Sequence, residues 1–281
     1  MIDAGEKIII EGPSFDREGN LFITAPSHGL VFKITPRKQV STVFSNHEII
    51  TCGSAFHRDG RLFVGCLSGE LLIINSDSSH TFLRPTYHGK RLSINDLVFD
   101  RQGNIYVTDF NGTAVEPTGG VYRLSVDGLT VQPVLLHLAS PNGVSLSPEG
   151  KVLWVGETTR NTILRIELML DGITPAPVDG VTCVYYSSGF PGPDSNRVDS
   201  KGNLYQCIMG QGRVVILNPV GIPVANIIVE GRDEGKTLRT ANLAFKPGTD
   251  EGYLVTSGKA GAWICKFKGL AQGLRLFSHA R

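Results

Sequence analysis

The sequence predicts an all-β fold, a six-bladed β-propeller whose four-stranded antiparallel blades surround a central channel, as one domain over residues 1–281. First, one strand–turn–strand pattern recurs six times along the chain. Second, the turn glycines of this pattern are spaced 41, 43, 47, 52 and 46 residues apart, which is the length of a four-stranded blade. Third, apolar and polar residues alternate within the strands and no long run has helical spacing, which argues against helices of any size.

Each repeat begins with a short strand that runs into a turn of Asp, Asn, Ser, Pro and Gly, residues that supply the backbone angles of tight hairpins. These first strands and turns occupy residues 13–19, 53–60, 96–103, 143–150, 195–202 and 242–248. Second strands follow directly at 20–25, 61–67, 104–110, 151–157, 203–209 and 252–258. Third strands lie at 29–35, 69–75, 119–125, 161–167, 212–218 and 262–268. A weaker fourth strand closes most units, as at 41–44, 80–83, 133–137 and 226–229.

Closure of the ring requires an outer strand for the last blade. Residues 7–10, with the sequence Lys-Ile-Ile-Ile, and residues 274–277 both have the composition for it. We expect the N-terminal segment to fill this place, with the C-terminal segment as the alternative.

Composition excludes several classes of function. A formal net charge of +1 without a cluster of Lys and Arg gives no general electrostatic reason to bind nucleic acid or an anionic membrane. The N-terminus lacks the pattern of a secretory signal, and no apolar run is long enough to cross a bilayer. The five cysteines include no C-x-x-C pair, which favours free thiols in a reducing cytosol over a disulfide framework. We therefore expect a cytoplasmic protein, and the oligomeric state stays open.

Six equivalent positions define a candidate site. In a propeller the first strand of each blade lines the channel, so the residue just before it lies at one mouth of the channel. In chain order these positions hold Glu11, Cys52, Asn95, Asn142, Asp194 and Ala241. The four oxygen-bearing residues each stand eight positions before the turn glycine of their repeat. Taken singly they are ordinary turn or strand-entry residues, but turn chemistry does not explain the shared position.

The chemistry of this set points to a hard cation. Glu11 and Asp194 are carboxylates and Asn95 and Asn142 are amides, so all four offer oxygen, with no imidazole and no paired thiolates. Such a set favours one divalent cation, Ca²⁺ first, with Mg²⁺ or Mn²⁺ as alternatives. The two carboxylates would neutralise the ion, and the small residues at Cys52 and Ala241 leave two sides open.

Five segments resemble one known family. They are IEGPSFD (10–16), INDLVFDRQGNIYVTDF (94–110), SPNGVSLSPEGKVLWVGETT (140–159), FPGPDSNRVDSKGNLY (190–205) and GQGRVVILNPVG (210–221). They resemble the calcium-dependent lactonases of the SMP-30/gluconolactonase/regucalcin-like family, which also includes diisopropyl fluorophosphatase. Within that family the likeness is strongest to the drug-responsive bacterial lactonases, and it covers nearly the whole chain.

The resemblance implies roles for the mouth residues. It implies that Glu11, Asn142 and Asp194 hold a catalytic calcium ion, with Asn95 beside them directly or through water. It also implies that Asp194 takes part in proton transfer, with Ser195 next to it. A second, structural calcium is expected in the second blade of the drug-responsive lactonases. Residues 66–92 of this chain are shorter there, so we predict only one cation.

These residues predict a hydrolase that opens a lactone ring. A divalent ion polarises the carbonyl group, and Asp194 takes a proton from the attacking water and returns it to the leaving alkoxide. Direct nucleophilic attack by Asp194 stays open as an alternative. Ser195, His28, Asn111 and Gln211 are candidates for contact with the substrate, although solvated loop polarity also accounts for the last three. For Asp109 and Glu157, at strand ends, we expect hydrogen bonds to the backbone instead of catalysis.

Two other functions remain possible at the sequence level. The same metal site could act on a phosphotriester or fluorophosphate, or on another ester or tautomer in catabolism. Alternatively, the protein could be a non-enzymatic propeller that serves as a binding module. The converging carboxylates argue against a plain scaffold, so the expected partner is a small lactone or ester.

Overall fold

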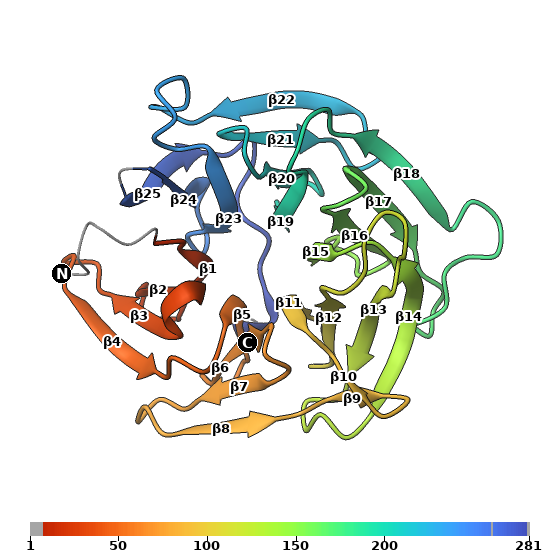
Figure 1. Ribbon diagram of the computed structural model, residues 1–281, viewed down its shortest axis with the longest axis horizontal. Coiled ribbons are helices and arrows are strands. Elements are labelled where there is room, and N and C mark those ends of the chain that lie inside the picture. Colours follow the sequence, from red (N-terminus) through yellow and green to blue (C-terminus); the bar gives the residue numbers. More distant parts are fainter. Residues whose placement is uncertain (1–7, 260, 280–281) are drawn as a thin grey trace.

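The computed structural model describes residues 8–259 and 261–279, and these form the six-bladed β-propeller predicted from the sequence (Figure 1). Antiparallel sheets surround a central axis, and their innermost strands lie next to one another around the channel. The helical segments within these residues are two 3-10 turns, η1 (Pro26–His28) and η2 (Phe277–His279). Accordingly, no helix in the described chain has the length and apolarity required to cross a membrane.

The blades follow one another along the chain, and each runs from its innermost strand outward. The first two blades consist of β1 (Glu11–Phe15), β2 (Leu21–Ala25), β3 (Leu30–Ile34) and β4 (Val40–Ser45), then β5 (Thr51–Phe56), β6 (Leu62–Cys66), β7 (Leu71–Ile74) and β8 (His80–Leu83). A small hairpin of β9 (Thr86–Tyr87) and β10 (Lys90–Arg91) leads into the third blade. The third and fourth blades consist of β11 (Ile94–Phe99), β12 (Ile105–Asp109), β13 (Gly119–Leu124) and β14 (Val131–Leu138), then β15 (Pro141–Leu146), β16 (Val152–Glu157), β17 (Thr162–Glu167) and β18 (Val181–Tyr186). The last two consist of β19 (Pro193–Val198), β20 (Leu204–Ile208), β21 (Arg213–Leu217) and β22 (Pro223–Ile228), then β23 (Arg239–Phe245), β24 (Glu251–Gly258) and β25 (Gly261–Lys268).

The sixth blade departs from the expected pattern, because in the described residues it has three strands and not four. Residues 8–10 are not in a strand, and Lys7 lies outside the described residues. Residues 274–277 also form no strand before η2, and Figure 1 shows the C-terminal segment running to the centre of the ring. The ring closes where β1 packs against β23, which is the same kind of contact that the innermost strands of the other neighbouring blades make. No outer strand from either end of the described chain takes part in this closure.

The turns between the first and second strands confirm the repeat. All six turn glycines adopt a positive φ, between 71° and 93°. A side chain disfavours this region of backbone space, which explains why glycine recurs at the same place in every blade.

The hydrophobic core lies between blades and not within them. Six clusters of buried side chains each combine residues from two neighbouring blades. One of them joins Phe15 and Ile23 of the first blade to Ala244 and Val255 of the sixth, so the series closes on itself. The innermost strands are almost entirely buried, whereas outer strands such as β4 and β22 are mostly exposed. Each blade therefore depends on its neighbours for burial, as expected for a repeat fold.

The cysteines agree with the prediction of free thiols. All five lie in the described part of the chain and none is in a disulfide. Cys66 and Cys207 are buried in hydrophobic clusters and Cys52 is buried at the channel mouth, whereas Cys183 is exposed on β18.

Candidate metal centre and active site

Each innermost strand has an irregularity at the mouth of the channel. Its pairing with the second strand breaks at corresponding places, which are Glu11/Ser14, Thr51/Ser54, Ile94/Leu97, Pro141/Val144, Pro193/Asn196 and Thr240/Asn242. Such β-bulges leave residues unpaired, bend the strand and change the direction of the side chains. Asn95, Asn142 and Asp194 lie within these breaks, and Glu11 lies at the edge of its own. The bulges explain how residues from different blades can turn toward one another.

The Ser195 hydroxyl joins two of the predicted ligands, and Ser195 itself directly follows a third, Asp194. The Ser195 hydroxyl lies 3.1 Å from Glu11 Oε1 and 3.4 Å from Asn142 Oδ1, so its proton can be donated to either acceptor. The Asn142 side chain also lowers the pKa of Asp194, against the effect of burial. Side chains from the first, fourth and fifth blades thus form one connected group, although 184 residues separate Glu11 from Ser195.

Asn95 occupies the same mouth position on β11. Its side chain is buried, and its Oδ1 atom accepts no hydrogen bond from any residue that the structure describes. A buried acceptor without a partner is unfavourable by about 1–3 kcal/mol. A cation at the channel mouth would satisfy this oxygen, so the arrangement fits the donor set that the sequence predicts.

The two carboxylates are buried and influence each other's protonation. Glu11 is 5% exposed and Asp194 is 7% exposed. Burial, followed by the charge of Asp96, raises the pKa of Glu11 to about 7. Burial, followed by the charge of Glu11, raises the pKa of Asp194 well above its usual value. Ionising both groups in this environment is therefore costly without a compensating positive charge.

Glu11 is held by three donors. Its Oε2 atom accepts a hydrogen bond of 2.9 Å from Asn242 Nδ2 and one from the Gly12 amide, while Ser195 contacts Oε1. At Cys52, the second mouth position, burial raises the pKa of the thiol well above its usual value. Cys52 therefore stays protonated, and the donors available at the mouth are oxygens.

The composition of this group limits which metal it can bind. In residues 8–259 and 261–279, no three or more His, Cys, Asp and Glu side chains gather in a way that could hold a metal ion. The candidate set contains only two such side chains, and its remaining donors are amides. It fits a hard cation that accepts neutral oxygen ligands, and it does not fit a zinc site of imidazoles and thiolates.

The predicted substrate-binding residues lie in loops on the same face. Second strands run antiparallel to the innermost ones, so they end at the mouth. His28 follows β2 and ends η1, Asn111 follows β12, and Gln211 follows β20. Asn111 donates to Asp109 Oδ1 at 2.7 Å and Gln211 donates to the Ser188 carbonyl, so the structure gives both a role in holding their loops.

The backbone roles expected for Asp109 and Glu157 are confirmed. Asp109 Oδ1 accepts the Ser93 amide at 2.7 Å. Glu157 Oε1 accepts the Ala139 amide at 2.8 Å.

Three charged or polar residues of the site were missed at the sequence level. Asn242 and Asp96 each follow a mouth position directly, and Arg197 comes three residues after Asp194. The sequence signal was available, because the position after the mouth holds glycine in three blades and a polar side chain in the other three.

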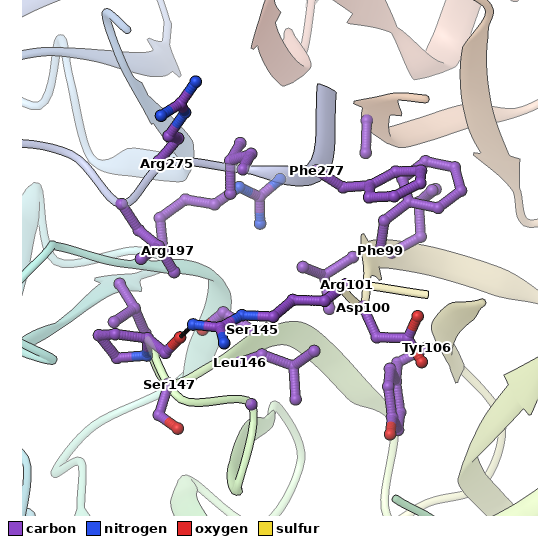
Figure 2. Close-up of a pocket in the computed structure, with 18 of the residues that line it drawn as sticks. Phe99, Asp100, Arg101, Tyr106, Ser145, Leu146, Ser147, Arg197, Arg275 and Phe277 are labelled. Atoms are coloured by element: carbon purple, nitrogen blue, oxygen red, sulfur yellow. Dashed lines mark hydrogen bonds between the residues drawn. The ribbon is translucent and has the colours of Figure 1, made fainter. Parts of the chain in front are cut away.

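A large cavity lies beyond this group, toward the other end of the channel. It has a volume of about 1250 Å³ and is lined by later residues of the innermost strands, by the first turns and by the C-terminal segment. Figure 2 shows this cavity, with Phe99 and Phe277 lying together on one side and with Arg197 among its lining residues. The four candidate ligands do not line it. We therefore place the candidate site at the mouth and not in the large cavity.

Comparison with known proteins identifies the family. The sequence model of one protein family, the SMP-30/gluconolactonase/LRE-like region, matches residues 9–257, which is most of the chain. This chain belongs to the SMP-30/gluconolactonase/LRE-like family. The resemblance predicted from the sequence is thereby confirmed.

Relatives of this family member include lactonases. The chain is 39% identical to "Lactonase drp35" of Staphylococcus saprophyticus over 273 residues, covering 94% of this chain and 84% of that protein. It is 38% identical to "Lactonase drp35" of Staphylococcus aureus over 283 residues, covering 95% and 85%.

Solved structures share the fold. A gluconolactonase from Xanthomonas campestris has a TM-score of 0.77 at 23% identity, over 92% of this chain and 86% of that one. A calcium-binding protein, regucalcin, from Agrobacterium tumefaciens has a TM-score of 0.74 at 18% identity, over 97% and 95%.

Proposed function

We propose that this protein is a metal-dependent lactonase that hydrolyses a lactone at the channel mouth, with one divalent cation, Ca²⁺, held by Glu11, Asn95, Asn142 and Asp194. The observation that carries the proposal is the connected, buried group of oxygen donors from separate blades, to which Asn95 adds an unsatisfied oxygen. The names of the drp35 relatives supply the substrate class. The regucalcin neighbour, described as calcium-binding, supports the choice of ion.

The residues of the chain divide the work. When bound, the cation supplies positive charge that stabilises the negative charge developing on the lactone carbonyl. Asp194 accepts a proton from the attacking water and delivers it to the ring oxygen as the acyl carbon–oxygen bond breaks, so the product is a hydroxy acid. Ser195 keeps Glu11 and Asn142 in place through its hydroxyl.

The surroundings of Asp194 suit a proton-transfer role. The side chain is buried, and its pKa lies well above the usual value for an aspartate. With the cation bound, its positive charge opposes this shift and favours the ionised carboxylate, which is the form that accepts a proton.

The test is a substrate panel with controlled metal content. Protein stripped with a chelator is assayed on aliphatic, sugar and aromatic lactones and on phosphotriesters, before and after addition of Ca²⁺, Mg²⁺ or Mn²⁺. We expect lactone hydrolysis that disappears with the chelator and returns with Ca²⁺. Hydrolysis of phosphotriesters but not of lactones would show that the protein is a phosphotriesterase and not a lactonase. Metal-loaded protein that hydrolyses nothing in the panel would favour a binding module.

A further inference from the structure

One buried ion pair lies next to the candidate ligands and takes no part in the proposed chemistry. Asp96 directly follows Asn95 on β11, and Arg197 comes three residues after Asp194 on β19. Their contact is bidentate, with Nη1 at 2.7 Å from Oδ2 and Nη2 at 3.2 Å from Oδ1. Asp96 is completely buried, and the Arg197 side chain is 12% exposed. The pair thus spans the channel between the third and fifth blades.

Asp96 is fixed from four blades. Besides Arg197 of the fifth, its carboxylate accepts the Leu97 amide of its own strand at 2.9 Å and the Val144 amide of the fourth blade at 3.4 Å. On the second blade, a Cβ added at Gly53 would lie only 2.4 Å from Asp96 Oδ1, so the glycine gives this carboxylate its room. Such a bidentate, buried contact holds the two strands in one relative position.

The pair adds no net charge beneath the mouth. The buried carboxylates on the innermost strands are Glu11, Asp96 and Asp194, and Arg197 is the guanidinium set among them. With a cation bound and all three carboxylates ionised, three negative charges and one positive charge leave a net charge of minus two, which is the charge of Glu11 and Asp194 alone. The innermost strands all lie in the described chain, and their remaining charged residue is Arg239. It is the first residue of β23 and is partly exposed.

The pair lies on the cavity side of the candidate ligands. Arg197 lines the large cavity, where Figure 2 shows its side chain, whereas Asn95 and Asp194 do not. The Asp96–Arg197 pair therefore lies between the candidate metal centre and the large cavity.

We propose that Asp96 and Arg197 are a positioning pair that holds Asn95 and Asp194 in register. Because its two charges cancel, the pair also keeps the site at the net charge of minus two that Glu11 and Asp194 give, which matches the site to divalent over trivalent cations. The inference rests on the proposed cation site and adds two residues to it. Coulomb attraction to a trivalent ion grows more steeply with site charge than attraction to a divalent one, so the ratio of the two affinities reports the charge.

The experiment measures binding of Ca²⁺ and Tb³⁺ to the chelator-stripped full chain by titration calorimetry. Asp96→Asn should lower the ratio of Tb³⁺ to Ca²⁺ affinity, and Arg197→Met should raise it, by roughly tenfold each. The double variant Asp96→Asn/Arg197→Met restores the net charge, so its ratio should equal that of the wild type. Because it lacks the bidentate contact, its affinity for both ions should still fall by roughly tenfold.

The control is another Asp–Arg pair of the same protein. Arg123 Nη2 lies 2.8 Å from Asp100 Oδ2, and neither residue is among the candidate ligands. The double variant Asp100→Asn/Arg123→Met should therefore leave the affinities for Ca²⁺ and Tb³⁺ unchanged. If both single variants kept the wild-type ratio of Tb³⁺ to Ca²⁺ affinity, the proposed effect of the pair on the charge of the site would be wrong. Wild-type affinities in the Asp96→Asn/Arg197→Met double variant would overturn the positioning role, even if the single variants fail to fold. A wild-type protein that binds neither ion would instead refute the proposed metal site.

Discussion

Glu11 and Asn95 show how two residues at equivalent positions meet different environments. The Glu11 carboxylate receives hydrogen bonds from Gly12, Asn242 and Ser195, which fix its orientation. The Asn95 carbonyl receives none from the described residues. A stable fold tolerates such an atom where function requires it, and this contrast makes Asn95 a sensitive probe of the site.

Among the single residues, Asp194 is the one on which the proposed reaction depends. Asp194→Asn should reduce lactone hydrolysis by at least about 100-fold, because an amide cannot accept the proton of the attacking water. Ca²⁺ affinity should fall less than turnover, since the amide oxygen can still coordinate. Steady-state kinetics and calcium titration measure the two effects separately. Asp109→Asn is the matched control, because that carboxylate bonds to Ser93 and Asn111 instead. Near-normal turnover in Asp194→Asn would remove the residue from proton transfer.

Asn95→Leu separates binding from stability. The substitution removes a buried oxygen that has no partner in the described chain, so the metal-free protein should unfold at the same or a higher temperature. The rise in melting temperature that Ca²⁺ produces in the wild type should disappear. Thermal unfolding with and without chelator measures both. A variant that Ca²⁺ still stabilises fully would show that Asn95 is not a ligand.

The site residues could be predicted to different extents. Glu11, Asn142 and Asp194 share a position eight residues before a turn glycine, so the repeat alone gathers them. Ser195 came only from the resemblance. Asn242 follows from the repeat only when the position after the mouth is compared across the blades, where every residue is glycine or polar. Arg197 could not be paired with Asp96, since a contact between residues 101 positions apart depends on how two blades face each other.

At the scale of the element, the bulges position the site. The sequence predicts where each innermost strand begins, but it does not predict that pairing breaks at its mouth end in every blade. A bulge is a property of two strands in register, and the sequence of one strand contains no equivalent signal. The glycines that follow the mouth position, such as Gly53, become meaningful only once the neighbouring blade is in place.

Gly53→Ala tests this close packing of blades. The new Cβ would lie 2.4 Å from Asp96 Oδ1 and 2.8 Å from the Asn95 carbonyl oxygen, which is backbone and cannot move aside cheaply. We expect a loss of about 1–3 kcal/mol in unfolding free energy, together with weaker Ca²⁺ binding. Chemical denaturation and calcium titration measure these effects.

Gly60→Ala is the matched control for Gly53→Ala. Its Cβ would meet nothing within 4 Å, but its φ of +93° disfavours a side chain. It should cost about 1–2 kcal/mol and leave Ca²⁺ affinity unchanged. Equal Ca²⁺ affinity in both variants would contradict the proposed link between Gly53 and the site.

At the scale of the whole molecule, the blade count followed from the repeat, and ring closure did not. The turn glycines and strand pattern gave six units, and the core clusters between neighbours are their direct consequence. Closure depends on side chains from the two ends of the chain meeting, as Phe15 and Val255 do. Apolar runs at residues 7–10 and 274–277 suggested a strand, but their composition is equally suited to packing without one.

A cation bound by four blades should stabilise the molecule as a unit. Because the proposed ligands come from the first, third, fourth and fifth blades, binding should raise the free energy of unfolding of the whole ring by about 2.7 kcal/mol at a concentration 100 times the Kd. Thermal unfolding should show one cooperative transition that moves upward with Ca²⁺. A transition that splits, with only part of it sensitive to Ca²⁺, would mean that the ion does not link the blades.

The most direct measurement is an anomalous difference map from crystals loaded with Mn²⁺ or Tb³⁺ in place of Ca²⁺. We predict one strong peak at the channel mouth, within coordination distance of Glu11, Asn95, Asn142 and Asp194, and a weaker peak in Glu11→Gln crystals, because the amide oxygen coordinates without the charge of the carboxylate. A well-diffracting loaded crystal with no peak among these four side chains, or with its peak in the large cavity beyond Arg197, would contradict the account.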